Sequence, residues 1–247
     1  MLLRLFPIIF YCFILFQKPA KSQTPLSDKK EDPQFFLLTV GLGPTLETRY
    51  GHTVLRLLSE DGQDHNYNWG MFSFSEPNFF LNFFLGKLRY WVADMDFQRF
   101  FWQYKYYYKR RIVSDEIKLT LNQKKHLIEI INENMKPENK FFWYQYFTEN
   151  CSTIPRDHLN KVLFGKIYEK FSNDYTGVTY RDYVRGNLNK PPIVSFFLDL
   201  MMNRHLDTPI SKWEEMFYPL KLREYLLEMP QINDLGEENP KEKILTN

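Results

Sequence analysis

The first 22 residues most constrain the fold, because they are typical of a segment that is removed before the rest of the chain folds. A short basic start, Met1–Arg4, precedes an unbroken apolar and aromatic run, Leu5–Phe16. Ala20-Lys21-Ser22 then supplies small residues of the kind that a signal peptidase recognises. The run is short for a bilayer span, so we expect an exported protein with a cleaved signal peptide over residues 1–22 rather than a retained anchor.

Export leaves the chain with one thiol. Cys12 lies inside the apolar run, so cleavage removes it and leaves only Cys151. Because no internal disulfide can then form, the fold must be held together by its hydrophobic core. Cys151 is either an apolar filler of that core or a reactive group, and composition alone does not separate the two.

The composition supplies a core and argues against polyanionic partners. Hydrophobic residues make up 44% of the chain, and the aromatic residues are 5 Trp, 16 Tyr and 23 Phe, which favours one globular domain. The net charge is +2, and loss of Arg4, Lys18 and Lys21 with the signal leaves 29 basic against 30 acidic residues. We therefore expect no binding of nucleic acid.

Three further absences in the sequence narrow the class of protein. No apolar run after the signal is long enough to cross a bilayer, so we expect no transmembrane helix in the mature chain. Cys151 is alone and the histidines lack metal-ligand spacing, so we expect no metal site. The chain also lacks a phosphate-binding glycine loop, so we expect no cofactor.

Hydrophobic patterning predicts an antiparallel sheet in the first part of the chain. Residues 35–40, 52–58 and 66–74 have strand character, and Asp61-Gly62 between the last two is a hairpin signal. The stretch 78–108 is crowded with aromatic residues spaced by three or four, which predicts helices, the second one capped by Asp94 or Asp96. The aromatic cluster over 78–86 is either core packing or a membrane-contacting face.

Helices dominate the expected second part. A strand over 112–121 precedes a helix from the cap Thr120 to Met135, and residues 141–147 are strand-like. A helix after Cys151 ends at Gly165, and helices over 179–188, 193–202 and 213–227 follow, interrupted by prolines. We expect a flexible leader over 23–33, a core over 34–165, a helical extension of the same domain over 166–229 and a frayed tail over 230–247.

The position of Cys151 favours reactivity. It follows Asn150, a good N-cap residue, so the thiol would lie in the first turn of a helix, where the dipole and the backbone N–H groups favour a thiolate. The same N–H groups could hold an oxyanion. Pro155 lacks the N–H that would bond to the carbonyl of Cys151, so the first turn is irregular or the regular helix begins nearer Pro155.

A cysteine nucleophile needs a base, and His52 is the best candidate among the five histidines. We expect His65, His126 and His205 to be exposed to solvent. His158 lies two helical turns from Cys151, which places its ring out of reach of the thiol.

His52 begins an apolar strand directly after Gly51. A hairpin centred near Asp61 places the residue opposite His52 between Asn68 and Met71. Asn68 is therefore well placed to orient the imidazole by a hydrogen bond. The alternative is a histidine whose polar atoms are satisfied in the core and that has no chemical role.

Several short blocks occur in a fixed order along the chain. They are Leu37-Leu38-Thr39-Val40-Gly41, Thr48-Arg49-Tyr50-Gly51-His52-Thr53, Tyr67-Asn68-Trp69-Gly70, Pro77-Asn78-Phe79 with Gly86-Lys87-Leu88, Asn150-Cys151-Ser152-Thr153 with Arg156-Asp157, and Glu214-Glu215-Met216-Phe217. Together they resemble the bacterial DUF4105 family, also described as the N-terminal, extracytoplasmic domain of the lipoprotein N-acyltransferase Lnb. The blocks around His52 and Cys151 also resemble lecithin retinol acyltransferase and the permuted NlpC/P60 proteins.

The resemblance implies a fold and a site. The fold is α+β, a permuted papain-like (NlpC/P60-type) antiparallel sheet packed on helices, with a helical C-terminal extension. Cys151 is then the nucleophile and His52 the base, while Asn68 as third member follows from the hairpin geometry. The residues expected to bind substrate or support the site are Arg49, Tyr50, Asn150, Arg156 and Asp157.

The implied activity is acyl transfer from a lipid or lipoprotein ester, through a thioester on Cys151, to an amine. The protein would work in the periplasm or elsewhere outside the cytoplasm, associated with a membrane surface. Full-length N-acyltransferases are embedded in the membrane, whereas this mature chain lacks a span, so two alternatives stay open. One is an NlpC/P60-like cysteine peptidase or amidase of the cell envelope, and the other is a non-catalytic envelope binding module in which Cys151 and His52 are structural.

Overall fold

The computed structural model describes residues 32–44, 48–59, 61–73, 75, 82, 87–186 and 204–246. Its centre is a seven-stranded sheet in the order β11-β5-β1-β2-β3-β4-β6, in which every neighbouring pair is antiparallel. The strands are β1 (Gln34–Val40), β2 (His52–Leu58), β3 (Asp64–Met71), β4 (Leu88–Asp96), β5 (Ile112–Ile117), β6 (Phe141–Tyr144) and β11 (Leu245–Thr246). The predicted α+β class with an antiparallel sheet is confirmed.

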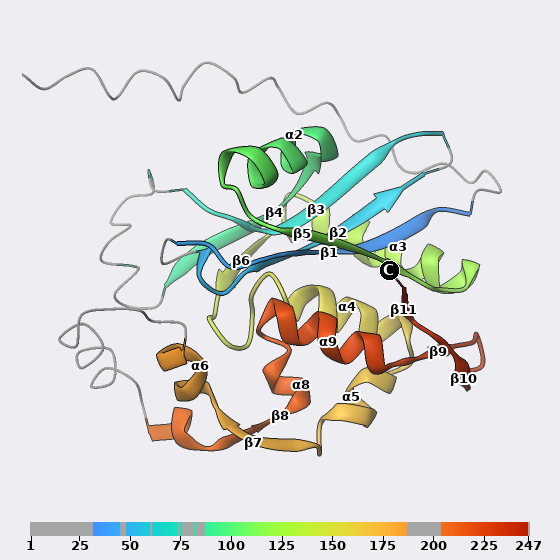
Figure 1. The fold of residues 1–247 in the computed structure, drawn as a ribbon. Coiled ribbons are helices and arrows are strands. Elements are labelled where there is room, and N and C mark those ends of the chain that lie inside the picture. The colour runs from blue at the N-terminus through green and yellow to red at the C-terminus, as the bar shows by residue number, and fades with distance from the viewer. Residues whose placement is uncertain are drawn as a thin grey trace, which may run out of the picture. The chain divides into compact units, whose positions relative to one another are not determined.

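Helices cover both faces of this sheet. Over the described residues there are seven α-helices: α2 (Phe97–Trp102), α3 (Leu121–Met135), α4 (Thr153–Val162), α5 (Lys166–Phe171), α6 (Tyr180–Gly186), α8 (Lys212–Glu215) and α9 (Pro219–Glu228). A π-helical turn, η2 (Gln103–Tyr107), continues α2, and a 3-10 turn, η3 (Arg204–Asp207), precedes the C-terminal helices. Figure 1 shows α2 on one side of the sheet and α4 and α9 on the other.

The central strands are apolar on both faces because both faces are covered. On the α2 side, Leu38, Val40 and Val54 pack against Phe100, and all four are fully buried. On the opposite side, the Trp69 ring lies against His158 of α4, and its Nε1 donates to Asn134 of α3 at 2.6 Å. Side chains alternate between faces along a strand, so Val54 and Asn68 point toward α2 while Trp69 points toward α3 and α4.

The predicted hairpin is confirmed. β2 and β3 pair in a register that runs from Leu58 opposite Asp64 to Leu55 opposite Tyr67. Gly62 lies in the turn with a positive φ of 83°, a conformation that glycine adopts without strain. The regular pairing of β2 with β3 does not extend beyond Leu55, so His52, at the start of β2, lies outside it. The predicted site lies at this open end of the hairpin.

Two helix caps predicted from the sequence are also present. The Asp96 side chain accepts from the backbone N–H of Arg99 and caps α2. Thr120 and Gln123 form a reciprocal capping box at the start of α3. Both helices therefore begin where their polar signals placed them.

The strand over residues 88–96 was not predicted. These residues form β4, which pairs with β3 on one side and β6 on the other. The second of the two helices predicted from the aromatic spacing is α2, and the first, over 78–86, lies outside the described residues except for Asn82. The strands predicted over 112–121 and 141–147 are shorter, and end at Ile117 and Tyr144.

Prolines divide the C-terminal helices differently from expected. The helix predicted over 213–227 is two helices, because Pro219 cannot continue α8 and instead occupies the first turn of α9. The helix after Cys151 ends at Val162. Phe164, with a φ of 56°, takes the left-handed position of its cap, and the N–H of Gly165 closes the end by donating to the Asn160 carbonyl at 2.8 Å. The helix predicted over 179–188 is α6, and the one over 193–202 lies outside the described residues.

The tail after Pro230 is not frayed. β9 (Pro230–Ile232) pairs with β10 (Glu238–Lys243), and β11 adds an edge strand to the main sheet beside β5. Ile232, Ile244 and Leu245 are buried, so a few apolar residues anchor an otherwise charged segment. A second small sheet joins β7 (Tyr175–Thr179) to β8 (Pro209–Ser211). Residues 1–31, which include the predicted signal and most of the leader, lie outside the described part.

Candidate active site

His52 and Asn68 meet at the open end of the β2–β3 hairpin. His52 Nε2 and Asn68 Oδ1 are 2.8 Å apart, and both residues are buried. The backbone N–H of Gly70 donates to the same Asn68 oxygen at 2.9 Å. A Cβ at Gly70 would lie 2.5 Å from His52 Cε1, so only glycine leaves room for the ring in this place.

These contacts define the neutral form of the imidazole. The Gly70 N–H identifies the shared atom of Asn68 as its oxygen, which can only accept. His52 Nε2 must therefore carry a hydrogen and donate it to that oxygen. In the neutral ring this leaves Nδ1 as the unprotonated nitrogen, the one that can accept a proton.

Cys151 lies near the start of β2. Its thiol is close enough to two backbone N–H groups, those of Thr53 and of Cys151 itself, for both to lower its pKa. The residue is only partly exposed. Since Thr53 directly follows His52, the fold brings the thiol to the same end of the sheet as the His52–Asn68 pair, although ninety-nine positions separate the two in the sequence.

Burial sets the protonation of both groups. It raises the pKa of the Cys151 thiol to about 11, against the smaller lowering by the two N–H groups and by the charge of Arg110. Burial also lowers the pKa of His52 to about 4, and the hydrogen bond to Asn68 offsets only part of that effect. At neutral pH the resting pair is a thiol and a neutral imidazole, so the thiolate expected from the helix start is not the resting form.

This protonation predicts slow alkylation of Cys151 near neutral pH. Iodoacetamide reacts with the thiolate, so the rate at the peptide that carries Cys151 should keep rising up to about pH 11 in the native protein. In the denatured protein it should level off near the ordinary thiol pKa of about 8.5, which makes native labelling at pH 8 roughly a hundredfold slower. Quantitative mass spectrometry over a pH series measures both rates. A native midpoint below about 8.5 would contradict the burial argument.

Two residues beside this pair were not predicted from the sequence. The Tyr104 ring, on η2, stacks on the His52 ring with centroids 6.0 Å apart. Arg110 is buried, donates through Nε to the Gly41 carbonyl at 2.8 Å, and its charge acts on both His52 and Cys151. In the sequence Arg110 stands between Lys109 and Arg111, and nothing distinguishes it from these two exposed neighbours.

The turn that carries Cys151 is held from both sides. The Asn150 side-chain oxygen accepts from the N–H groups of Ser152 and Thr153 at 2.7 and 2.9 Å, and its amide nitrogen donates to the carbonyls of Tyr146 and Phe217. Asn150 therefore caps the first turn as predicted. The regular helix α4 begins only at Thr153, in agreement with the missing N–H of Pro155.

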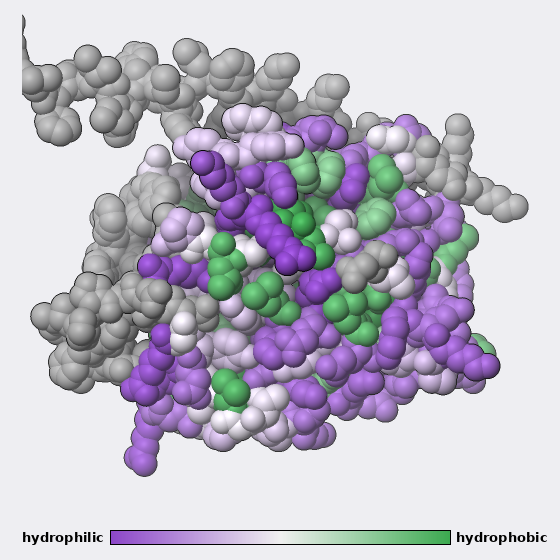
Figure 2. Space-filling model, viewed as in Figure 1, coloured by the Kyte–Doolittle hydropathy of each residue, from purple (hydrophilic) through white to green (hydrophobic). Residues whose placement is uncertain are grey.

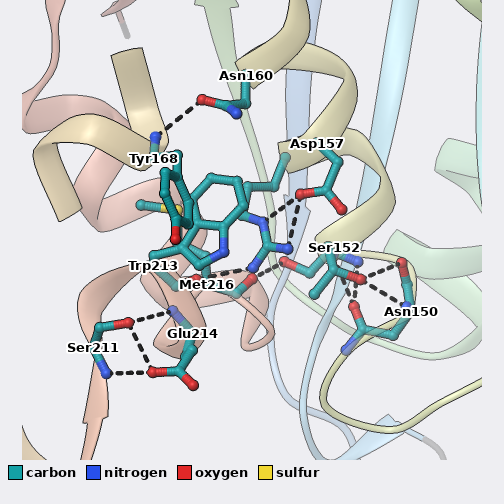
Figure 3. A network of polar contacts seen from close by, with 11 residues as sticks. Asn150, Ser152, Asp157, Asn160, Tyr168, Ser211, Trp213, Glu214 and Met216 are labelled. Carbon is teal, nitrogen blue, oxygen red and sulfur yellow. Dashed lines mark hydrogen bonds and ion pairs between the residues drawn. The ribbon is translucent and has the colours of Figure 1, made fainter. Parts of the chain in front are cut away.

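The rest of the motif binds a distant segment rather than the thiol. Ser152 Oγ donates to the carbonyl of Met216 at 2.7 Å, and Arg156 donates to the carbonyl of Trp213 at 2.9 Å while its guanidinium lies 3.7 Å from the centre of that ring. Asp157 accepts from Arg156 at 2.8 Å. Figure 3 shows these contacts converging between α4 and the 211–216 segment. Arg156 and Asp157 thus connect elements of the scaffold.

Arg49 and Tyr50 flank the site differently. Arg49 donates to the carbonyl of Pro44 on the exposed loop. The Tyr50 ring meets the Tyr146 ring edge to face at 5.0 Å, and burial raises the pKa of both phenols. The charge of a Cys151 thiolate would raise the pKa values of Tyr144 and Tyr146, so both phenols lie near the thiol.

A comparison with protein families shows to which family the chain belongs. The family model described as the Lnb N-terminal periplasmic domain matches residues 27–186, which include His52, Asn68 and Cys151. The chain belongs to this family. No curated protein and no solved structure was found to match it.

The family description agrees with the predicted location of the chain outside the cytoplasm, since the Lnb domain is described as periplasmic. Over the residues that the structure describes, no helix is both long and apolar enough to cross a bilayer. Within the same residues, no group of three or more His, Cys, Asp or Glu side chains could hold a metal ion.

The remaining histidines of this Lnb domain lie elsewhere. His65 is half-buried rather than exposed, and its 2.6 Å contact with Asp94 raises its pKa. His126 is exposed on α3, as predicted. Burial against Trp69 lowers the pKa of His158 to about 4, and its ring lies on the opposite face of the sheet from Asn68. The side chain of His205 lies outside the described residues.

Proposed function

We propose that this Lnb-type domain is a cysteine acyltransferase that moves an acyl chain from a lipid or lipoprotein ester through Cys151 to an amine. The observation that carries the proposal is the pair of bonds to Asn68 Oδ1, from His52 Nε2 and from the Gly70 N–H. They leave His52 Nδ1 as the proton acceptor at the end of β2, where the Thr53 N–H lies by the thiol. Family membership supports the same reading, and so does the antiparallel sheet with His52 on a strand that precedes the cysteine helix. On these grounds we propose a permuted papain-like core.

In the first step His52 Nδ1 takes the thiol proton as the sulfur attacks the ester carbonyl. Collapse of the tetrahedral intermediate breaks the carbon–oxygen bond, and His52 returns the proton to the leaving alkoxide. The product is a thioester on Cys151. In the second step the amine attacks the thioester, His52 takes the amine proton, and the departing sulfur recovers it as a thiol.

The neutral resting pair suits this sequence of steps. Because the pKa of His52 is about 4 and that of the thiol about 11, the proton moves only when the sulfur begins to bond to carbon. The N–H groups of Thr53 and Cys151 can stabilise the negative charge that develops at that moment. A buried aromatic surround, which includes Tyr104 and Tyr144, keeps water from the thioester and favours transfer over hydrolysis.

Whole-protein mass spectrometry tests the proposal. The protein is incubated with a synthetic diacylated lipopeptide, and we expect one added acyl mass on Cys151, removable by hydroxylamine, together with N-acylated product. Release of free fatty acid without N-acylation would point to a hydrolase. Cleavage of cell-wall peptide fragments without any acyl adduct would support the peptidase or amidase alternative. No adduct and no product with any of these substrates would support the non-catalytic binding module.

A further inference from the structure

The helix that covers His52 carries an unusual outer surface. From Phe97 to Arg111 the chain contains no acidic residue, and four of its cations are exposed. Trp102, Tyr106 and Tyr107 are 61%, 61% and 68% exposed, although large aromatic side chains are ordinarily buried. We call this the aromatic–cationic surface, and its members are Arg99, Trp102, Lys105, Tyr106, Tyr107, Tyr108, Lys109 and Arg111.

The lysines of this surface form no ion pair over the described residues. Lys105 and Lys109 share this with the exposed Lys125 and Lys241, whereas the half-buried Lys166 pairs with Glu169. The surface is set apart by the absence of any acidic residue from Phe97 to Arg111 and by its exposed aromatic rings. Lys109 also has a φ of 52° at the end of a helix, where glycine is the usual residue. A lysine therefore occupies a backbone conformation that disfavours any side chain.

We propose that the aromatic–cationic surface binds the headgroup region of a bilayer that contains anionic phospholipid. Trp and Tyr side chains prefer the boundary between headgroups and acyl chains, and clustered Lys and Arg are attracted to anionic lipid. The net charge of the whole chain is only +2, so it gives no reason to expect a nucleic acid at this surface. Figure 2 shows pale, near-neutral residues beside strongly hydrophilic ones along the upper edge, where Figure 1 places α2.

The same helix joins this surface to the candidate site. Phe100 packs α2 against Leu38 and Val54 of the sheet, while Tyr104 points inward and stacks on His52. The π-helical turn places the inward Tyr104 and the outward Tyr106 and Tyr107 within four residues of one another. Binding through this surface would hold His52 and Cys151 beside the bilayer. Vesicle binding itself rests only on the surface, so it can fail or succeed independently of the acyl-transfer proposal.

Sedimentation with vesicles tests the inference. The protein is purified from the periplasm of an expressing bacterium and mixed with phosphatidylcholine vesicles that either contain or lack phosphatidylglycerol. We expect binding that requires phosphatidylglycerol and weakens with salt. Changing Lys105 and Lys109 together to Gln should lower the affinity about tenfold or more, and changing Trp102, Tyr106 and Tyr107 together to Ala should do the same.

Matched variants elsewhere on the surface are the controls. Tyr168→Ala with Tyr175→Ala removes aromatics that are 53% and 61% exposed, and Lys125→Gln with Lys241→Gln removes two exposed charges. Both control variants, and Cys151→Ala, should bind as the unchanged protein does. Equal binding to neutral vesicles, no binding to either vesicle, or equal losses in the control variants would overturn the inference. Circular dichroism confirms that each variant is folded.

Discussion

Cys151→Ala is expected to lose acyl transfer completely within detection, a drop of about 10⁴-fold or more, because no thioester can form without the sulfur. His52→Ala should lower the rate by roughly 10² to 10⁴, the usual contribution of a general base. The double variant should be no slower than Cys151→Ala alone, since the two residues act in one step. Single-turnover rates with diacylated lipopeptide measure all three. If Cys151→Ala retained transfer, the thioester mechanism would be wrong.

The transfer rate of the unchanged protein should depend little on pH near neutrality. The pKa of His52 is lowered to about 4, so the base is lost only as the pH falls through about 4. The thiol pKa of about 11 places the other limit far above neutrality. We therefore expect a nearly flat rate between about pH 5 and 10 rather than a bell centred near 7. A bell with limits near 6 and 8 would show that the resting pair is an ion pair.

Gly70→Ala is expected to impair transfer about as strongly as His52→Ala, a loss of roughly 10²-fold or more. The new methyl would lie 2.5 Å from His52 Cε1 and 3.1 Å from Asn68 Oδ1, so the ring and its partner must move apart. Backbone strain is not the cause, because Gly70 does not have a positive φ. Transfer rates and thermal unfolding should be measured together.

Gly186→Ala is the matched control for this change. A Cβ there meets nothing within 4 Å and its φ is ordinary, so both rate and stability should be unchanged. A Gly70→Ala protein that is folded and fully active would mean that the position of the imidazole on Asn68 does not matter for the reaction. That outcome would favour a structural role for His52.

The sequence allowed the His52–Asn68 contact to be predicted because a short hairpin has few possible registers. Once Asp61-Gly62 is placed at the turn, alternation along two strands determines which side chains face each other. Gly70 lies on the same hairpin, but its importance was not predicted. Glycine is required there because the His52 ring crosses from the neighbouring strand. A glycine on the strand opposite a candidate histidine is therefore a useful sequence signal.

The protonation of Cys151 could not be predicted in the same way. Local sequence gives the helix start and its N–H groups, which favour the thiolate, but it does not give the burial that raises the pKa. The groups that interact with the thiol, Tyr104 of η2, Tyr144 of β6 and Arg110, come from segments distant in the sequence. The strand character of β4 and the ordered end of the chain were missed for a related reason, since both depend on pairing with distant strands.

The anchoring of the cysteine turn has a practical meaning for dissecting this protein. Asn150, Ser152 and Arg156 each donate to a main-chain oxygen that lies between Trp213 and Phe217, well beyond the last residue matched by the family model. A fragment trimmed to residues 27–186 would expose those donors to solvent and also lose the edge strand β11. The smallest piece that can be cloned or transplanted with the Cys151 turn held in place is thus longer than the shared family region.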